Sequence, residues 1–319
     1  MKFATYLHRD RQSYGVVRSG GICDLPACWP DGPASMLELL QAGPQALQAA
    51  AARAARCDRL IPQADVRLLA PIPNPPKVVA LAGNYVKHIQ ESNLAKGLTS
   101  SPAVDTTPRP FLMPATAIAG PGTEIPWPCY SRQIDYEIEL AVVIGSRCKC
   151  VPPDQAGQYI AGYTIANDVS ARSTTFAEGR SRRPWDEFYD WLNGKWADCF
   201  CPIGPYLVTA DEVGDPADLQ LELTVNGRTR QKESTACMIF GVYEIVSFVS
   251  HIMTLTPGDV IATGTPSGVG MADGNYLAGG DVITCRIEKI GELTNTLGRP
   301  PASFYTPCKE AAERSARKA

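Results

Sequence analysis

Three acidic residues alternate with apolar ones in the segment from Asp135 to Ile144. Successive side chains of a β-strand point to opposite faces, so Asp135, Glu137 and Glu139 would share one face. Glu137 and Glu139 would lie about 6.6 Å apart along the backbone, and carboxylates so placed raise one another's pKa unless a cation lies between them. A hard divalent metal ion is one candidate. An amphipathic edge strand with a solvated acidic face explains the pattern equally well. The opposite, apolar face would carry Ile134, Tyr136, Ile138, Leu140, Val142 and Ile144.

A second polar pair, Asn167-Asp168, ends the apolar run Tyr163–Ala166. Asp168 could present a third oxygen ligand there. Taken alone, such a pair is more often a turn or the N-cap of a helix.

A third segment, Gly83–Glu91, directly follows the expected strand Val78–Leu81 and contains Tyr85, His88 and Glu91. If this segment is helical, His88 and Glu91 are three residues apart on one face, and the carboxylate can orient the imidazole as a general base. A solvated surface pair is the usual outcome of this spacing.

Residues Thr256–Gly270 combine a turn, a short strand and a glycine-rich loop. Gly264 permits a ligand to approach the backbone closely, and the hydroxyls of Thr263 and Thr265 can hydrogen-bond to it. The Gly-Lys-Ser/Thr of a Walker loop is absent, so a nucleotide is not implied.

Composition excludes several classes of function. The 319 residues carry a formal net charge of -3 with no basic stripe, which argues against a nucleic-acid partner. No segment approaches the ~20 apolar residues of a membrane span.

The start of the chain lacks an apolar signal region, so its eleven cysteines are expected to be buried, reduced thiols of a cytoplasmic protein. Two Cys-x-Cys pairs, at 148/150 and 199/201, lack the spacing and the histidine of a zinc knuckle.

The pattern of elements predicts two domains. Residues 1–70 read as a small module with strands at 2–7 and 15–17 and helices at 35–41 and 44–57, followed by a stiff proline-rich linker at 71–76. Residues 77–300 carry many short strands, a hairpin signal at Asn226-Gly227, and one helix at 240–254 that leaves His251 on its solvated side. Residues 301–319 form a charged tail, expected to be a surface helix or disordered. The expected strands of the large domain lie at 78–81, 140–144, 160–165, 207–209, 221–225, 260–262 and 282–287.

Together these segments resemble the fumarylacetoacetate hydrolase family over residues 77–297. The resemblance rests on four motifs, which occur in the family's order: Asp135–Gly145, Gly162–Arg172, Cys201–Pro205 and Pro257–Gly270. It implies an α+β fold, with a mixed β-sheet roll of the family's C-terminal type and a small N-terminal α/β domain. It further implies Mg²⁺, with Mn²⁺ or Ca²⁺ as alternatives, and a homodimer.

The resemblance also assigns roles to residues. Glu137, Glu139 and Asp168 match the metal ligands, and His88 and Glu91 match a dyad that activates water under a mobile lid. Lys195 matches an active-site lysine. The residues expected to contact substrate are Thr265, Arg172, Tyr85 and Gly264, although Arg172 could instead only support the site.

The expected reaction is hydrolysis of a C–C bond in a 2,4-dioxo acid of the acylpyruvate type. His88 would take a proton from water, water would attack the distal carbonyl, and Lys195 would stabilise the resulting alkoxide. Decarboxylation or enol–keto isomerisation of a related 2-oxo acid needs the same charge stabilisation and remains the alternative, as does a non-catalytic binding protein on this fold.

Departures from the family pattern cluster where substrate would be recognised. Met113 replaces a lysine, residues 173–195 are longer than is common, Thr174 or Thr175 stands where a glutamine is often seen, and the expected lid at 92–110 is long and polar. These changes favour a larger or less common substrate.

Overall fold

The computed structural model describes residues 1–95 and 106–305. Its centre is an 11-stranded mixed sheet in the order β3-β2-β1-β13-β11-β10-β16-β5-β6, with β4 beside β1 and β7 beside β13. The bounds are β1 Lys2–His8, β2 Arg11–Arg18, β3 Gly21–Asp24, β4 Arg67–Leu68, β5 Val78–Leu81, β6 Pro110–Met113, β7 Ile118–Ala119, β10 Ile138–Ile144, β11 Ile160–Asn167, β13 Cys201–Thr209 and β16 Val260–Ala262.

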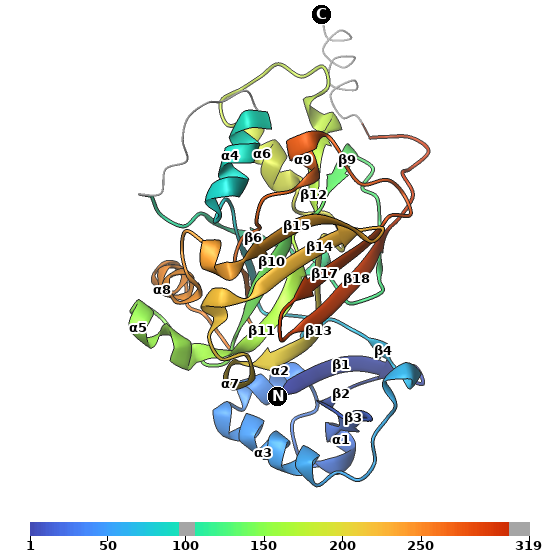
Figure 1. The fold of residues 1–319 in the computed structure, drawn as a ribbon, viewed down its shortest axis with the longest axis vertical. Coiled ribbons are helices and arrows are strands. Elements are labelled where there is room, and N and C mark those ends of the chain that lie inside the picture. The colour runs from blue at the N-terminus through green and yellow to red at the C-terminus, as the bar shows by residue number, and fades with distance from the viewer. Residues whose placement is uncertain (96–105, 306–319) are drawn as a thin grey trace, which may run out of the picture.

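A five-stranded sheet packs against the middle of the large sheet, where β14, β17 and β18 contact β10, β11 and β13 (Figure 1). The core between the two sheets is built from aliphatic side chains of both. The strands are β15 Arg228–Ser234, β14 Gln220–Val225, β17 Val282–Ile287, β18 Gly291–Leu297 and β8 Glu124–Ile125, and a separate two-stranded sheet pairs β9 Ser131–Asp135 with β12 Ser170–Thr174.

The helices lie around these sheets. The largest apolar helix, α8, buries Val242, Ile245, Val246 and Val249 and leaves His251 exposed, as its pattern predicts. The helices are α1 Leu25–Cys28, α2 Met36–Gln41, α3 Pro44–Ala55, α4 Val86–Ala95, α5 Pro153–Ala156, α6 Asp186–Asn193, α7 Ala210–Val213, α8 Val242–Ile252 and α9 Gly270–Asp273. No helix in the described ranges is long and apolar enough to cross a membrane.

Most of the strands expected from the sequence form. The strands predicted at 78–81, 260–262 and 282–287 have the observed bounds of β5, β16 and β17. Asn226 and Gly227 join β14 to β15 with φ of 49° and 76°, the two positive values of a type I′ hairpin turn. The α+β class and mixed sheets are therefore confirmed.

One expectation is wrong: the acidic segment is two strands rather than one. β9 ends at Asp135 and β10 begins at Ile138, and the two belong to different sheets. The break arises because side chains replace strand partners. The Asp135 carboxylate accepts the Tyr136 N–H at 2.9 Å, and Gln231 accepts the Ile138 N–H at 3.0 Å. The alternation nevertheless persists, since the six apolar residues of the predicted face all lie in one core.

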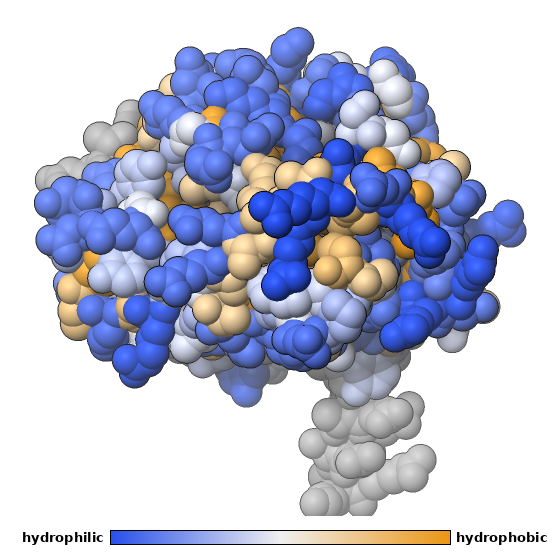
Figure 2. Space-filling view, turned by 90° about the horizontal axis from the view of Figure 1, so that it is seen from below, coloured by the Kyte–Doolittle hydropathy of each residue, from blue (hydrophilic) through white to orange (hydrophobic). Residues whose placement is uncertain are grey.

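The N-terminal module shares the large sheet. β1 pairs with β13 through Lys2 and Val208, so β1–β3 extend the sheet that carries the acidic strand. The proline-rich segment is packed rather than free, because Thr5 donates a 2.6 Å hydrogen bond to the Pro71 carbonyl and Ile72 is buried. Figure 2 views this end of the molecule and shows mostly hydrophilic side chains with apolar areas between them. The boundary at residue 70 stays a prediction.

Two sequence-based expectations lie outside the described residues, wholly or in part. The lid predicted at 92–110 includes residues 96–105, and the tail predicted at 301–319 includes residues 306–319. The ten cysteines within the described ranges are free thiols, of which four are buried and the others are half-buried or exposed.

Candidate metal centre and active site

Three carboxylates meet where the acidic segment crosses from one sheet to the other. Glu137 lies between β9 and β10, Glu139 lies in β10, and Asp168 follows β11, which is the antiparallel neighbour of β10. Ligand oxygens of the three side chains lie within 4.8 Å of one another. The residues are 5%, 0% and 1% exposed, so the alternative of a solvated acidic face is excluded.

Two of these oxygens lack a hydrogen-bond donor. Glu139 Oε1 and Asp168 Oδ1 are buried and have no hydrogen-bond partner among the described residues. An unsatisfied buried carboxylate oxygen costs free energy that a cation at the same place would recover. The donor set is all oxygen, which suits a hard divalent ion such as Mg²⁺ or Mn²⁺. The residues present therefore fit the metal that the sequence pattern predicts.

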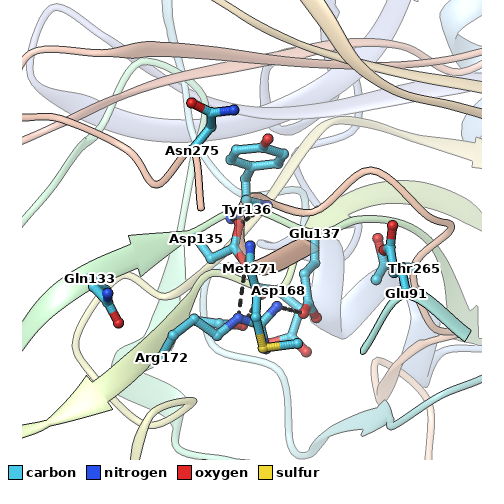
Figure 3. A network of polar contacts seen from close by, with 12 residues as sticks. Glu91, Gln133, Asp135, Tyr136, Glu137, Asp168, Arg172, Thr265, Met271 and Asn275 are labelled. Atoms are coloured by element: carbon cyan, nitrogen blue, oxygen red, sulfur yellow. Dashed lines mark hydrogen bonds and ion pairs between the residues drawn. The ribbon is translucent and has the colours of Figure 1, made fainter. Parts of the chain in front are cut away.

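Two buried cations neutralise the carboxylates in part. Lys195 Nζ lies 2.7 Å from Glu137 Oε2 and 2.6 Å from Asp168 Oδ2. Arg172 Nε lies 2.9 Å from Asp135 Oδ2, and its Nη2 pairs with Glu137 Oε1. In Figure 3, Arg172 reaches Asp135 and Glu137 from one side, while Thr265 and Glu91 lie on the other side of Glu137. Four carboxylates and two cations leave an excess of negative charge that one divalent ion would balance.

The pKa values reflect this uneven pairing. Burial works against ionisation of Glu137, but Lys195 and Arg172 outweigh it and lower the pKa of Glu137 to about 2. Burial raises the pKa of Asp168 to about 6 in spite of Lys195. Burial, together with the neighbouring Asp168 and Glu137, raises the pKa of Glu139 well above its usual value. An additional cation would therefore favour ionisation of Glu139 most, because its pKa is raised by burial and by the two neighbouring carboxylates.

Asp135 connects the carboxylate cluster to the glycine-rich loop. Its carboxylate accepts the backbone N–H groups of Gly270 at 2.6 Å and Met271 at 3.0 Å, besides the Arg172 guanidinium. All of its strong acceptor positions are thus used by the protein itself. Asp135 therefore holds the shape of the site and is not among the residues available to a metal ion.

The predicted histidine–glutamate pair is formed. His88 Nδ1 lies 3.0 Å from Glu91 Oε1 within α4, three residues apart as the spacing predicts. The Gly268 N–H lies 3.1 and 2.9 Å from the two Glu91 oxygens and donates to them, which anchors the helix to the glycine-rich loop. The charge of His88 also helps to lower the pKa of Glu137, so the imidazole lies near the carboxylate cluster.

Gly264 and Thr265 are placed by the protein's own contacts. The Gly264 N–H donates to Glu139 Oε2 at 2.8 Å, and a Cβ on Gly264 would lie 2.6 Å from the Asn84 Cβ. With φ of +96°, this position favours glycine. The buried Thr265 hydroxyl accepts from Gln231 Nε2 at 2.9 Å. A substrate contact at either residue stays a prediction.

Tyr85 is a further buried polar residue near Glu139. The residue is buried, and its hydroxyl has no hydrogen-bond partner in the described part of the chain. Burial raises the pKa of the Tyr85 phenol, and Glu139 raises it further. A neutral hydroxyl of this kind can donate to a bound anion, which supports the prediction of a substrate contact.

Three residues of the site carried no recognisable signal in the sequence. Gln231 braces Thr265 and the start of β10, and it comes from β15, whose sequence is almost entirely polar. The Asn84 side chain holds the segment before α4 against the glycine-rich loop, because it donates to the Thr263 carbonyl at 2.8 Å. Trp191 lies in the long insertion, in α6. Of the three, only Asn84 has a position that could have suggested a role in the site, because it comes just after a buried strand.

The long insertion borders Lys195, whereas Met113 lies in the apolar core. The rings of Trp191 and Phe111 have centroids 5.9 Å from Lys195 Nζ, and the two rings meet edge-to-face at 4.9 Å. Met113, which stands where the family often has lysine, is buried in the apolar core beneath the large sheet. The insertion at 173–195 therefore contributes a wall of the site, whereas Met113 contributes core packing.

Comparison with known proteins agrees with the geometry. The sequence model of the fumarylacetoacetate (FAA) hydrolase C-terminal domain matches residues 77–298. The oxaloacetate tautomerase FAHD2A, mitochondrial, of Bos taurus is 40% identical over 278 residues, covering 86% of this chain and 83% of the relative.

Two solved structures represent other reactions on the same fold. The 5-carboxymethyl-2-hydroxymuconate delta-isomerase of Mycobacterium smegmatis is 32% identical with a TM-score of 0.68, over 94% of this chain and all of the other. The maleylpyruvate hydrolase of Sphingobium sp. SYK-6, in complex with manganese (II) ion and pyruvate, is 31% identical with a TM-score of 0.73 over the same shares. The extent of the sequence match, together with the buried carboxylate cluster it contains, shows that the chain belongs to the fumarylacetoacetate hydrolase family.

Proposed function

We propose that the protein catalyses keto–enol tautomerisation of a 2-oxo dicarboxylic acid of the oxaloacetate type, with a divalent cation as cofactor. The observation that carries the proposal is the His88–Glu91 pair, held next to buried carboxylates of which two oxygens have no partner among the described residues. The similarity to an oxaloacetate tautomerase over most of both chains supports the choice of reaction.

Glu137, Glu139 and Asp168 would hold the cation. When bound, it would supply Lewis-acid stabilisation of the negative charge that develops on the 2-oxo oxygen as a proton leaves the neighbouring carbon. Tyr85 and Thr265 would orient the substrate carboxylate through their hydroxyls. Lys195 keeps Glu137 ionised at neutral pH, as the lowered pKa of that carboxyl shows.

His88 is the proposed acid and base. Because Glu91 occupies Nδ1, proton transfer falls to Nε2. Nε2 accepts a proton from the carbon next to the 2-oxo group and returns one to the oxygen, which gives the enol without net change in atoms. Glu91 would stabilise the transient imidazolium charge, and the Gly268 N–H, which donates to both carboxylate oxygens, holds Glu91 in place.

Hydrolysis of a 1,3-diketo acid is the second candidate. It is favoured by the similarity to a maleylpyruvate hydrolase and by the capacity of the same His88–Glu91 pair to deprotonate water. In that reaction Lys195 would stabilise the alkoxide formed at the attacked carbonyl. Decarboxylation needs no activated water and is the third outcome to be distinguished.

The test follows the loss of enol absorbance with oxaloacetate, first with Mg²⁺ or Mn²⁺ and then with a chelator. Tautomerisation leaves the mass of the oxo acid unchanged, hydrolysis of acylpyruvates gives two acids with labelled solvent oxygen in one, and decarboxylation gives CO₂. His88→Ala should lower proton transfer at least about 100-fold. His251→Ala, which removes an exposed histidine of α8, is the matched control. Metal-independent turnover, or full activity in His88→Ala, contradicts the proposal.

We further propose that the protein acts as a cytoplasmic homodimer, as the family resemblance implies for the assembly. Light scattering during size-exclusion chromatography measures the mass in solution. A mass equal to that of one chain of 34.4 kDa would overturn the dimer and leave the chemistry untouched.

A further inference from the structure

Three thiols gather in the N-terminal module, far from the carboxylate cluster in the sequence. Cys23 lies in β3, Cys28 ends α1, and Cys57 lies just beyond α3. Their sulfur atoms lie within 4.8 Å of one another, and Cys23 Sγ and Cys28 Sγ are 3.6 Å apart. Apart from the carboxylate cluster, this is the one group of possible metal ligands found in the described ranges.

Hydrogen bonds of side chains outside the thiol group hold the segments that carry the three cysteines. The Asp24 side chain caps α1 by accepting the Ala27 N–H at 2.9 Å, which sets Cys28 relative to Cys23. Arg18 Nη1 donates to the carbonyls of Ala54 and Cys57 at 2.7 and 2.8 Å, which ties the end of α3 to β2.

A backbone bridge completes this frame. Ile22 and Ile61 exchange two hydrogen bonds of 2.8 and 2.9 Å, which hold the segment after Cys57 beside β3. The thiols are therefore brought together by the fold, before any ligand binds.

The spacing suits a thiophilic metal ion. Zn–S bonds of about 2.3 Å place the sulfurs of a tetrahedral site about 3.8 Å apart, close to the separation of Cys23 and Cys28. Sulfur ligands without carboxylates or amides select soft ions over Mg²⁺ or Ca²⁺. The two clusters of this chain thus differ in ligand chemistry, one all sulfur and one all oxygen.

A hollow of about 870 Å³ opens beside the thiols. Cys28 and Cys57 line it, while Cys23 is buried, so a fourth ligand could reach the ion from this side. Three arginines and two aspartates also line the hollow, and this positive excess would offset part of the negative charge of three thiolates; these residues are Arg11, Arg56, Arg59, Asp24 and Asp58.

We propose that Cys23, Cys28 and Cys57 form a second metal site, which binds one Zn²⁺-class thiophilic ion with its fourth position open to the hollow. The site is separate from the carboxylate centre and does not take part in the proposed reaction.

Cadmium is the probe, because thiolate ligation gives an ultraviolet charge-transfer band that oxygen ligands do not give. Titration of the reduced full-length protein should saturate this band at one Cd²⁺ per chain, and Zn²⁺ should abolish it by competition while excess Mg²⁺ should not. Cys28→Ser and Cys57→Ser should each weaken binding at least about 100-fold. Cys129→Ser, which changes an exposed thiol outside the group, is the matched control.

A second measurement guards against misfolded variants. In the unmodified protein, Zn²⁺ should protect Cys28 and Cys57 from alkylation, mapped by mass spectrometry, and leave Cys129 reactive. An unchanged band in Cys57→Ser overturns the proposal, as does equal alkylation with and without Zn²⁺. A Cys23–Cys28 disulfide that forms under mild oxidation, in a protein whose reduced form gives no Cd²⁺ band, would likewise overturn it.

Discussion

Glu139 is the carboxylate of the cluster with the least support from the protein. One of its oxygens accepts the Gly264 N–H and the other has no partner among the described residues, whereas Glu137 pairs with both Lys195 and Arg172. Its raised pKa shows that the folded protein disfavours its charge. This environment fits the proposed role of Glu139 as a metal ligand and offers no gain in stability from its charge.

Substitution of Glu139 by glutamine tests this directly. Because a buried like charge is removed, Glu139→Gln should be at least as stable as the original protein in the presence of chelator. Mg²⁺ should no longer raise its melting temperature, and activity should be lost. Thermal unfolding with and without Mg²⁺ measures both effects. Glu233→Gln, which removes a carboxylate paired with the exposed Lys87, is the control and should keep the Mg²⁺ response.

The pH dependence of metal binding follows from the same groups. The pKa of Asp168 lies at about 6 and that of Glu139 is also raised, so both folded-state values exceed the usual ones. Without metal, the contribution of Asp168 to stability is present below the usual carboxyl pKa and is lost as pH rises through about 6. The contribution of Glu139 has the same sign, because its pKa is raised too. A bound cation must displace these protons. Mg²⁺ affinity, measured by calorimetry, should therefore rise at least about tenfold between about pH 5 and about pH 7. A flat profile would contradict the pKa shifts.

At the scale of elements, the glycine-rich loop positions both halves of the site. Its Gly264 supports Glu139, and its Gly268 supports Glu91. Gly268 has φ of +103°, and a Cβ there would overlap the Arg230 carbonyl oxygen on β15. The loop thus has no room to move toward β15 without a change in the sheet.

Gly268→Ala should consequently displace the loop and release Glu91. We expect a loss of about 1–3 kcal/mol in the free energy of unfolding and a fall of about 100-fold in turnover. Gly274→Ala is the matched control, since Gly274 also has positive φ but a Cβ there meets nothing within 4 Å. Gly274→Ala should lose no more stability than Gly268→Ala, and it should keep the turnover of the original protein. Equal turnover in the two variants would show that Glu91 does not depend on the loop.

The features of the site that could be predicted from the sequence are those that depend on neighbouring residues in the chain. Alternation predicted that Glu137 and Glu139 accompany an apolar face, and helical spacing predicted the contact of His88 with Glu91. The break at Tyr136–Glu137 could not be predicted, because the acceptors that replace strand partners include Asn167 and Gln231 from distant segments. The wall formed by Trp191 could not be predicted either, because its contact with Phe111 joins segments about eighty positions apart.

At the scale of the whole molecule, the two predicted domains are joined by one sheet. β1 covers the edge of β13, and the core beneath the large sheet combines residues of α2 and α3 with β5 and β10. Such a pairing joins residues about two hundred positions apart, which no local pattern reveals. Stability of the catalytic part should therefore depend on the N-terminal module.

Removal of the module tests this dependence. A chain that begins at Ile72 exposes the edge of β13 and the apolar core beneath it, so it should aggregate or unfold, whereas the full chain should melt in one cooperative transition. Calorimetry and light scattering measure the two results. Addition of a fragment of residues 1–71 should restore soluble protein in part. A monodisperse, folded chain from Ile72 onward would show that the module is dispensable.

Lys195 and Arg172 give the centre a counter-charge that belongs to the chain itself. Because an ammonium and a guanidinium already neutralise Glu137 and Asp135, with Asp168 partly relieved, the cluster can fold before any ion arrives. With the proposed cofactor, loading would then be a late and reversible event, governed by the supply of ions around the finished protein. The identity of the bound ion would then change with growth conditions. The same folded chain could exchange one divalent ion for another without new protein synthesis.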